Sequence, residues 1–205
     1  MSARVPNARA ALVLFALAAL CAGCPQESTS VPGRVNAASG AAGESSAAKR
    51  AKIAAGFCDV THAAGKGPRF ELPKLAGAAA PELGGGKRLW VNVWATWCKP
   101  CVAELPLLSR WPARLAGVRF VMLSADADAD ALRAFYKRRP KTPRGPRLAD
   151  ADAKALAAWL GKYGLAAGAS LPVHFFVGAD QRVRCVRAAT LRSSDYPRVA
   201  AMLAP

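Results

Sequence analysis

The junction between an apolar segment and two cysteines constrains the fold of this chain most. Residues 89–94 are a nearly continuous run of strand formers, typical of a central strand that is covered on both faces. Cys98 and Cys101 follow in C-x-x-C spacing, and Pro100 suits the first turn of a helix. Apolar residues then recur about once per turn, which predicts a helix over 100–111. The two cysteines are therefore expected at a strand-to-helix junction.

The pattern after this junction continues to alternate between strands and helices. The predicted elements are, in chain order, a strand over 118–124, a helix capped by Asp128 or Asp130, a helix over 154–163, strands over 173–177 and 182–188, and a helix capped by Ser193 or Ser194. A strand-helix-strand-helix order favours an α/β fold with a partly parallel sheet.

The N-terminus has the pattern of an exported protein. Two arginines precede an apolar run over 10–20, which is the layout of a bacterial export signal and is too short to span a bilayer comfortably. Small residues before Cys24 resemble a lipobox, so we predict a signal peptide over 1–23 and lipid attachment at Cys24. Because Cys21 stands where a lipobox usually has leucine, an ordinary secretory signal stays an alternative. We expect a protein anchored to an envelope membrane and facing the periplasm or extracytoplasmic space.

Composition divides the rest of the chain. Residues 24–48 are rich in Ser, Gly, Ala and Pro and have almost no large apolar side chain, which predicts a flexible tether. A short helix is expected near 47–55, within an N-terminal extension that runs over 49–67. The folded domain is expected over 68–205, a length that suits one domain with a sizeable core.

The chain is strongly basic, with a formal net charge of +16 at pH 7. Such a charge favours anionic lipid or acidic partner surfaces. No nucleic-acid-binding motif accompanies it, so we expect no nucleic-acid partner. Six of the basic residues gather near one proline-rich segment, for which we expect a solvated loop or a docking site for an acidic partner or lipid: Lys137, Arg138, Arg139, Lys141, Arg144 and Arg147.

The C-x-x-C pair predicts redox chemistry. At a strand-to-helix junction the first sulfur lies at the helix N-terminus, where free backbone amides and the helix dipole stabilise a thiolate. Cys98 is therefore the expected nucleophile, and Cys101 the thiol that resolves the mixed disulfide. A zinc site would need a second C-x-x-C or suitably spaced histidines, and the chain has only two histidines. We expect neither a metal nor a cofactor.

Two further cysteines lie outside this motif. Cys58 precedes the core and Cys185 lies in the last predicted strand. Export would place both in a compartment that permits disulfides. We predict a structural disulfide between them that ties the N-terminal segment to the sheet, with two buried free thiols as the alternative.

Residues 91–101, with the sequence VNVWATWCKPC, resemble the TlpA/ResA branch of the thioredoxin superfamily. The following Glu-Leu-Pro at 104–106 and the Leu-Pro at 171–172 extend the resemblance over roughly 68–204. It implies the thioredoxin fold, a central mixed sheet flanked by helices. It also implies reduction or exchange of disulfides in exported proteins, often during cytochrome c maturation. The active-site motif then includes Trp97, Lys99 and Pro100.

The resemblance carries further positions over one by one. Pro172 matches the cis-proline that faces the active-site disulfide, with an ordinary strand-start proline as the alternative. Glu104 matches the acidic residue near the dithiol and would accept the proton of Cys101, whereas an exposed helix glutamate without a role is the alternative. Asn92 stands where thioredoxins have a buried aspartate. His174 departs from the family pattern and is expected to be a strand side chain rather than a catalytic base.

Three functions fit these patterns. The first is a membrane-tethered reductase of disulfides in exported proteins, supplied with electrons by a membrane thiol reductant. The second is an oxidase or isomerase that uses the same residues with the opposite redox poise. The third is a copper-delivery module whose ligands are Cys98, Cys101 and His174. The family resemblance favours the first.

Overall fold

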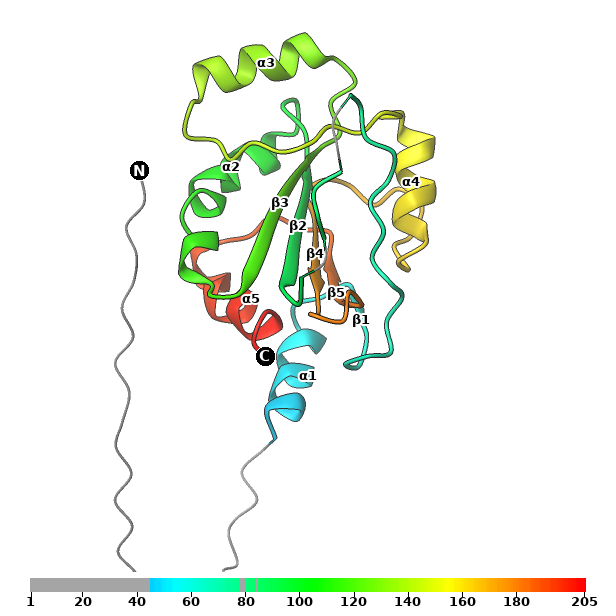
Figure 1. Ribbon diagram of the computed structural model, residues 1–205, viewed down its shortest axis with the longest axis vertical. Helices are drawn as coiled ribbons and strands as arrows, with labels where there is room; N and C mark the ends of the chain where they lie inside the picture. Colours follow the sequence, from blue (N-terminus) through cyan, green and yellow to red (C-terminus); the bar gives the residue numbers. More distant parts are fainter. Residues whose placement is uncertain (1–44, 78–79, 84) are drawn as a thin grey trace, which may run out of the picture. The chain divides into compact units, whose positions relative to one another are not determined.

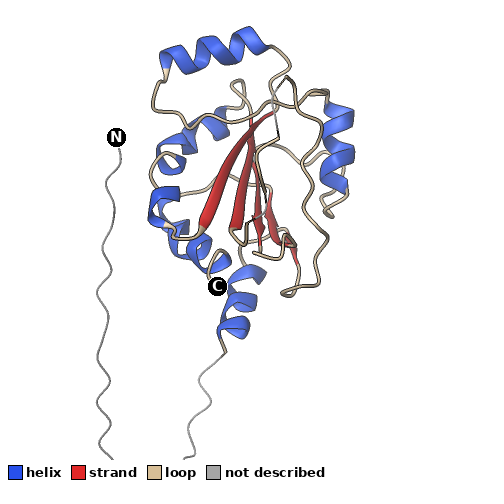
Figure 2. Cartoon of the chain, viewed as in Figure 1, coloured by secondary structure: helices blue, strands red, loops and turns tan. Residues whose placement is uncertain are grey.

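The computed structural model describes residues 45–77, 80–83 and 85–205 (Figures 1 and 2). The predicted signal peptide, Cys24 and most of the predicted tether lie outside these ranges. Within them, no helix is both long enough and apolar enough to cross a membrane.

A mixed sheet forms the centre of the described domain, with the strands in the order β1-β5-β4-β2-β3. The strands are β1 Val60–Thr61, β2 Arg88–Trp94, β3 Val118–Ser124, β4 Val173–Val177 and β5 Val183–Arg187. β2 and β3 are parallel, and the other neighbours are antiparallel. β2 lies between β3 and β4 and is buried from its second residue on, as its continuous apolar run predicts.

Helices cover both faces of this sheet. They are α1 Ser46–Ala55, α2 Lys99–Leu108, α3 Ala129–Arg138, α4 Ala153–Gly161 and α5 Tyr196–Met202. α2 and α5 lie on one side of the sheet and α4 on the other, while α3 lies across one end (Figure 1). Ring contacts agree with this arrangement. Trp111, just after α2, packs against Trp90 of β2 and Tyr196 of α5, whereas Trp159 of α4 packs against Phe175 of β4.

Helix boundaries differ from the prediction by up to three residues, and the end of α2 and the start of α5 show why. α2 ends at Leu108, three residues before the predicted end. Trp111 lies in the turn after the helix, but its side chain is still buried in the core. α5 begins at Tyr196 after a short 3-10 turn, and neither predicted serine caps it. Asp195 takes the N-cap position instead, where its buried carboxylate accepts the N–H of the residue that precedes the turn.

The N-terminal segment belongs to the folded domain. α1 begins at Ser46, so the last three residues of the predicted tether are helical. The following chain adds β1 antiparallel to β5, with Thr61 opposite Cys185. Cys58 and Cys185 are joined by a disulfide that links positions 127 residues apart. The predicted extension over 49–67 is therefore held to the sheet by strand pairing and by a covalent bond.

The basic segment after α3 is packed rather than fully solvated. The Ser124 N–H of β3 donates to the Pro146 carbonyl at 2.9 Å. A side chain at Gly145 would collide with the Met122 carbonyl oxygen, so this close approach requires glycine. The Arg147 guanidinium donates to three backbone carbonyls. The backbone around Gly145 and the Arg147 side chain are thus packed, while the other five cations of the predicted cluster are exposed, as a solvated loop predicts: Lys137, Arg138, Arg139, Lys141 and Arg144.

Candidate active site

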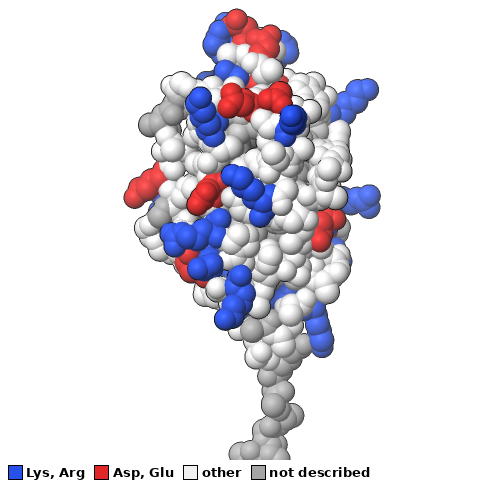
Figure 3. Space-filling model, turned by 90° about the vertical axis from the view of Figure 1, so that its right-hand side faces the viewer, with Lys and Arg blue, Asp and Glu red and all other residues white. Residues whose placement is uncertain are grey.

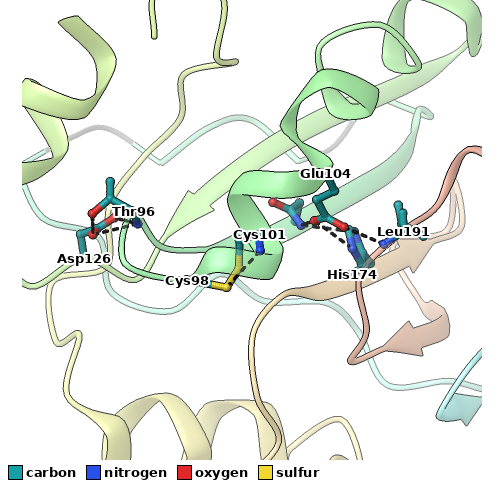
Figure 4. Close-up of a disulfide and its surroundings, with 8 residues drawn as sticks. Thr96, Cys98, Cys101, Glu104, Asp126, His174 and Leu191 are labelled. Atoms are coloured by element: carbon teal, nitrogen blue, oxygen red, sulfur yellow. Dashed lines mark hydrogen bonds and ion pairs between the residues drawn. A yellow bond between two sulfur atoms is a disulfide. The ribbon is translucent and has the colours of Figure 1, made fainter. Parts of the chain in front are cut away.

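Cys98 and Cys101 form a disulfide at the amino end of α2 (Figure 4). Cys98 is the N-cap residue, and its sulfur accepts a hydrogen bond from the Cys101 N–H at 3.2 Å. Cys98 is 5% exposed, whereas Cys101 is completely buried. Because the positive end of the helix stabilises a negative sulfur at the N-cap, Cys98 is the better thiolate and the more accessible of the two sulfurs.

The other residues of the motif lie at the surface. Trp97 is 67% exposed and is the large apolar side chain that the described residues leave most open to solvent. Lys99 and Pro100 begin α2 and are exposed beside it. The motif thus presents an aromatic ring and an ammonium group next to the reactive sulfur.

A buried carboxylate that the sequence analysis missed fixes the loop before Cys98. The Thr96 N–H donates to both carboxylate oxygens of Asp126 at 3.1 Å, and the Ser124 hydroxyl donates to the same group at 2.8 Å. Asp126 lies two residues beyond the end of β3, and Thr96 two residues beyond the end of β2. Because β2 and β3 are parallel, both residues lie at the same end of the sheet. That topology was the available signal for this contact.

Glu104 is buried, with 1% of its surface exposed, so the exposed-glutamate alternative is wrong. Its carboxylate accepts hydrogen bonds from the Leu191 N–H at 2.7 Å and from the Asn92 side-chain amide at 3.0 Å. The His174 Nε2 lies 3.3 Å from one of its oxygens. Figure 4 shows Glu104 turned toward His174 and Leu191. The buried carboxylate thus has polar partners on β2, on β4 and in the segment after β5.

The contacts of His174 fix its tautomer. The Trp90 indole N–H, which can only donate, points to His174 Nδ1 at 3.3 Å, and the Asn92 amide nitrogen lies at the same distance. Nδ1 is therefore an acceptor and the ring proton sits on Nε2, facing Glu104. His174 is completely buried in β4 and its Nδ1 is already bonded by Trp90, as expected for a strand side chain, which argues against the copper-ligand alternative. No group of three or more His, Cys, Asp or Glu side chains suited to a metal gathers within the described part of the chain.

The Leu171–Pro172 peptide bond is cis. Pro172 directly precedes β4, whose first residue Val173 pairs with Val93 near the carboxyl end of β2. The register therefore brings Pro172 to the end of the sheet from which the C-x-x-C motif emerges.

A mixed sheet with a parallel β2–β3 pair, a C-x-x-C motif at the start of the helix after β2 and a cis-proline before β4 define a thioredoxin-like fold. This confirms the predicted fold class. The chain belongs to the Redoxin family, whose model matches residues 64–203.

Curated relatives match shorter stretches. The chain is 36% identical over 73 residues to the thioredoxin-like protein YneN of Bacillus subtilis, a match that covers 33% of this chain and 43% of that protein. It is 31% identical over 100 residues to the thiol-disulfide oxidoreductase ResA of Bacillus thuringiensis, which covers 48% and 53%. Among solved structures, StoA from Bacillus subtilis is 15% identical with a TM-score of 0.44, covering 57% of this chain and 84% of that one. The matches span about half the length of the curated relatives or less.

Proposed function

We propose that this protein is a thiol-disulfide oxidoreductase that reduces disulfides in exported proteins. The observation that carries the proposal is the asymmetry of the two sulfurs. Cys98 sits at a helix N-cap and accepts a backbone N–H, while Cys101 is enclosed one turn later. Membership of the Redoxin family and local similarity to ResA support the same chemistry.

The reaction begins from the dithiol form. The Cys98 thiolate attacks one sulfur of the client disulfide, that bond breaks, and the released client sulfur takes up a proton. A mixed disulfide now joins the client to Cys98. Cys101 loses its proton and attacks the Cys98 sulfur, which releases the second client thiol. Two electrons have moved to the client, and the protein is left with the Cys98–Cys101 disulfide.

Four residues support this exchange. Glu104, one helical turn beyond Cys101, accepts the proton that Cys101 loses. Asn92 and His174 hold the carboxylate of Glu104 in place through the contacts described above. The backbone beside the cis-Pro172 pairs with the client chain next to Cys98.

The proposed setting is the cell envelope. A signal peptide over 1–23, a lipid on Cys24 and a tether over 24–48 would hold the domain at a membrane and face it toward the extracytoplasmic space. A membrane thiol reductant would restore the dithiol after each turnover. All four described cysteines are paired in disulfides, as is usual for exported proteins. The resemblance to the TlpA/ResA branch makes cytochrome c maturation the proposed pathway.

The exchange is tested by trapping. Cys101→Ser removes the resolving thiol, so the variant should accumulate a mixed disulfide on Cys98 that mass spectrometry identifies. The matched control Cys98→Ser/Cys101→Ser should trap nothing by this route. Absence of any adduct on Cys98 in cells that express the variant would contradict the exchange mechanism.

The direction of electron flow is tested by the reduction potential of the Cys98–Cys101 pair, equilibrated against glutathione or dithiothreitol mixtures. A value near or below about −270 mV, as in thioredoxin, is expected for a reductase. A value near about −120 mV, as in strong oxidants of this fold, would favour the oxidase alternative.

A further inference from the structure

Two adjoining hollows extend along the outer face of α2, where it is bordered by α3 and the segment after it. Their volumes are about 370 and 550 Å³, and Arg139 belongs to the walls of both. We call this surface the α2–α3 groove and define its floor by its apolar residues, Val102, Leu105, Pro106, Phe135 and Pro140. The first hollow also includes Thr96 and Lys99, so the groove begins at residues that flank Trp97 and Cys98 in the sequence.

The rim of the α2–α3 groove is positively charged. Its charged residues are all basic and all exposed: Lys99, Arg110, Arg138, Arg139 and Lys141. No carboxylate belongs to either lining, and the ion pairs found in the described ranges involve none of these five cations. The groove therefore combines a rim of exposed cations with an apolar floor.

The face of the domain that α4 covers is different. Figure 3 shows Lys and Arg side chains interspersed there with Asp and Glu. Salt screens charges that lie more than about 8 Å apart at physiological ionic strength. Where charges of both signs are interspersed, each cation is therefore compensated mainly by its acidic neighbours. The lining of the α2–α3 groove differs from this face because it contains cations and no carboxylate.

We infer that the α2–α3 groove binds an acidic, extended polypeptide segment of the client, adjacent to the cysteine that Cys98 attacks. The inference rests on the proposed function and names its substrate class. Charge complementarity selects Asp and Glu, and the apolar floor accepts the aliphatic parts of their side chains. A concave surface fits a polypeptide segment, whereas a flat lipid surface would leave the floor unfilled.

The length of α2 sets the size of the segment. Its ten residues rise about 15 Å, which an extended chain spans with about five residues. Lys99, Val102 and Pro106 follow one another along α2 at three- to four-residue spacing, so they form one stripe, and Arg110 lies just beyond the end of the helix. A client segment of about five residues, anchored by its cysteine at Cys98, would lie along the whole stripe.

The experiment compares two cysteine peptides that each carry a fluorescent reporter through a disulfide. One has five Glu and Asp residues beside the cysteine, and the other has Gln and Asn at the same places. The dithiol form of the protein should reduce the acidic peptide about tenfold faster at low salt, because complementary charge raises the association rate. The ratio of the two rates should fall toward one as salt is added.

Charge reversal locates the effect. Arg138→Glu/Lys141→Glu should bring the ratio of rates to one or below, and the milder Arg138→Gln/Lys141→Gln should lower it in part. The matched control is Lys154→Glu/Lys162→Glu, which reverses two exposed cations on or next to α4 and should keep the ratio of the unmodified protein. Equal rates for both peptides with the unmodified protein at low salt would overturn the inference, and so would an equal loss in the control.

Two further outcomes separate this inference from the proposed function. If neither peptide is reduced, the exchange function fails, and the groove is tested alone by fluorescence anisotropy with a labelled acidic peptide that lacks cysteine. Saturable binding that the Arg138→Glu/Lys141→Glu variant loses would support the groove. Binding to phosphatidylglycerol vesicles that depends on the same two residues, without binding of the peptide, would overturn it in favour of a lipid surface.

Discussion

Replacing Cys58 and Cys185 together by alanine is expected to lower the free energy of unfolding by about 5 kcal/mol. Their disulfide joins residues 127 positions apart and so closes most of the described domain into one loop. β1, which the bond fastens beside β5, pairs through only two residues. The N-terminal segment therefore depends on the covalent bond more than on its strand pairing.

The magnitude follows from the entropy that the bond removes from the unfolded chain. For a loop of this length the loss is about 16 cal/mol/K, or about 5 kcal/mol at 298 K. The Cys98–Cys101 disulfide is the internal comparison, because it spans a sequence separation of only 3. The same relation gives about 2 kcal/mol for it. Since whole domains are stable by only about 5–15 kcal/mol, the first variant should be close to unfolding.

Urea unfolding of the oxidised proteins, followed by circular dichroism, measures both effects. The Cys58→Ala/Cys185→Ala variant is compared with the matched Cys98→Ala/Cys101→Ala variant under identical conditions. If the first variant loses no more stability than the second, the loop-closure reasoning is refuted. Alkylation of Cys58 or Cys185 in the unreduced protein, detected by mass mapping, would refute the pairing itself.

Three further substitutions test other contacts. Glu104→Gln should lower the free energy of unfolding by about 2 kcal/mol, because the amide turns an N–H toward a buried donor such as the Leu191 N–H. The substitution should also slow disulfide exchange near neutral pH. Unchanged urea unfolding together with an unchanged pH–rate profile would contradict both effects. Tyr163→Phe should lower the free energy of unfolding by about 1–2 kcal/mol at pH 7, because the hydroxyl accepts the Glu71 N–H and donates to the Glu71 carbonyl. Burial raises the pKa of Tyr163 above its ordinary 10.0, so the unfolded chain loses this proton first and stability falls as pH rises from 10 through the raised pKa; a fall equally steep in Tyr163→Phe would exclude this residue as its cause. Trp97→Ala should change the free energy of unfolding by less than about 0.5 kcal/mol, because the ring is mostly exposed, while slowing exchange with a protein client; a large shift in the urea midpoint would show that the ring is structural.

The central elements of the fold could be predicted because their hydrophobic periods are strong. The strands over 118–124 and 173–177 match β3 and β4 residue for residue. Helix ends were less predictable, since a buried residue just beyond a helix can continue the apolar spacing of that helix. Trp111 keeps the apolar spacing of α2 although it lies beyond the helix end. The start of α5 is shifted by the 3-10 turn that precedes it, so Asp195 takes the N-cap position, and local sequence does not distinguish it from the two preceding serines.

In the candidate site too, the residues set by local sequence could be predicted, and those set by strand pairing could not. Cys98 and Cys101 stand out through their spacing, which is a local property of the chain. The positions of Asp126 and His174 are set by strand register, since their partners Thr96 and Glu104 lie 30 and 70 residues away in sequence. A single sequence has no signal for such pairs until the order of the strands is known.

The segment that runs beside β5 has a consequence for how the sheet meets other chains. Asp59 and His62 donate their N–H groups to β5 carbonyls, and the Val183 N–H donates to the Pro68 carbonyl. The Asp59 carboxylate accepts the Ala188 N–H just beyond the strand. The outer row of backbone groups on β5 is thus occupied from end to end, and it offers no template to a foreign strand. An unfolded client can approach closely and still find no free edge there on which to aggregate.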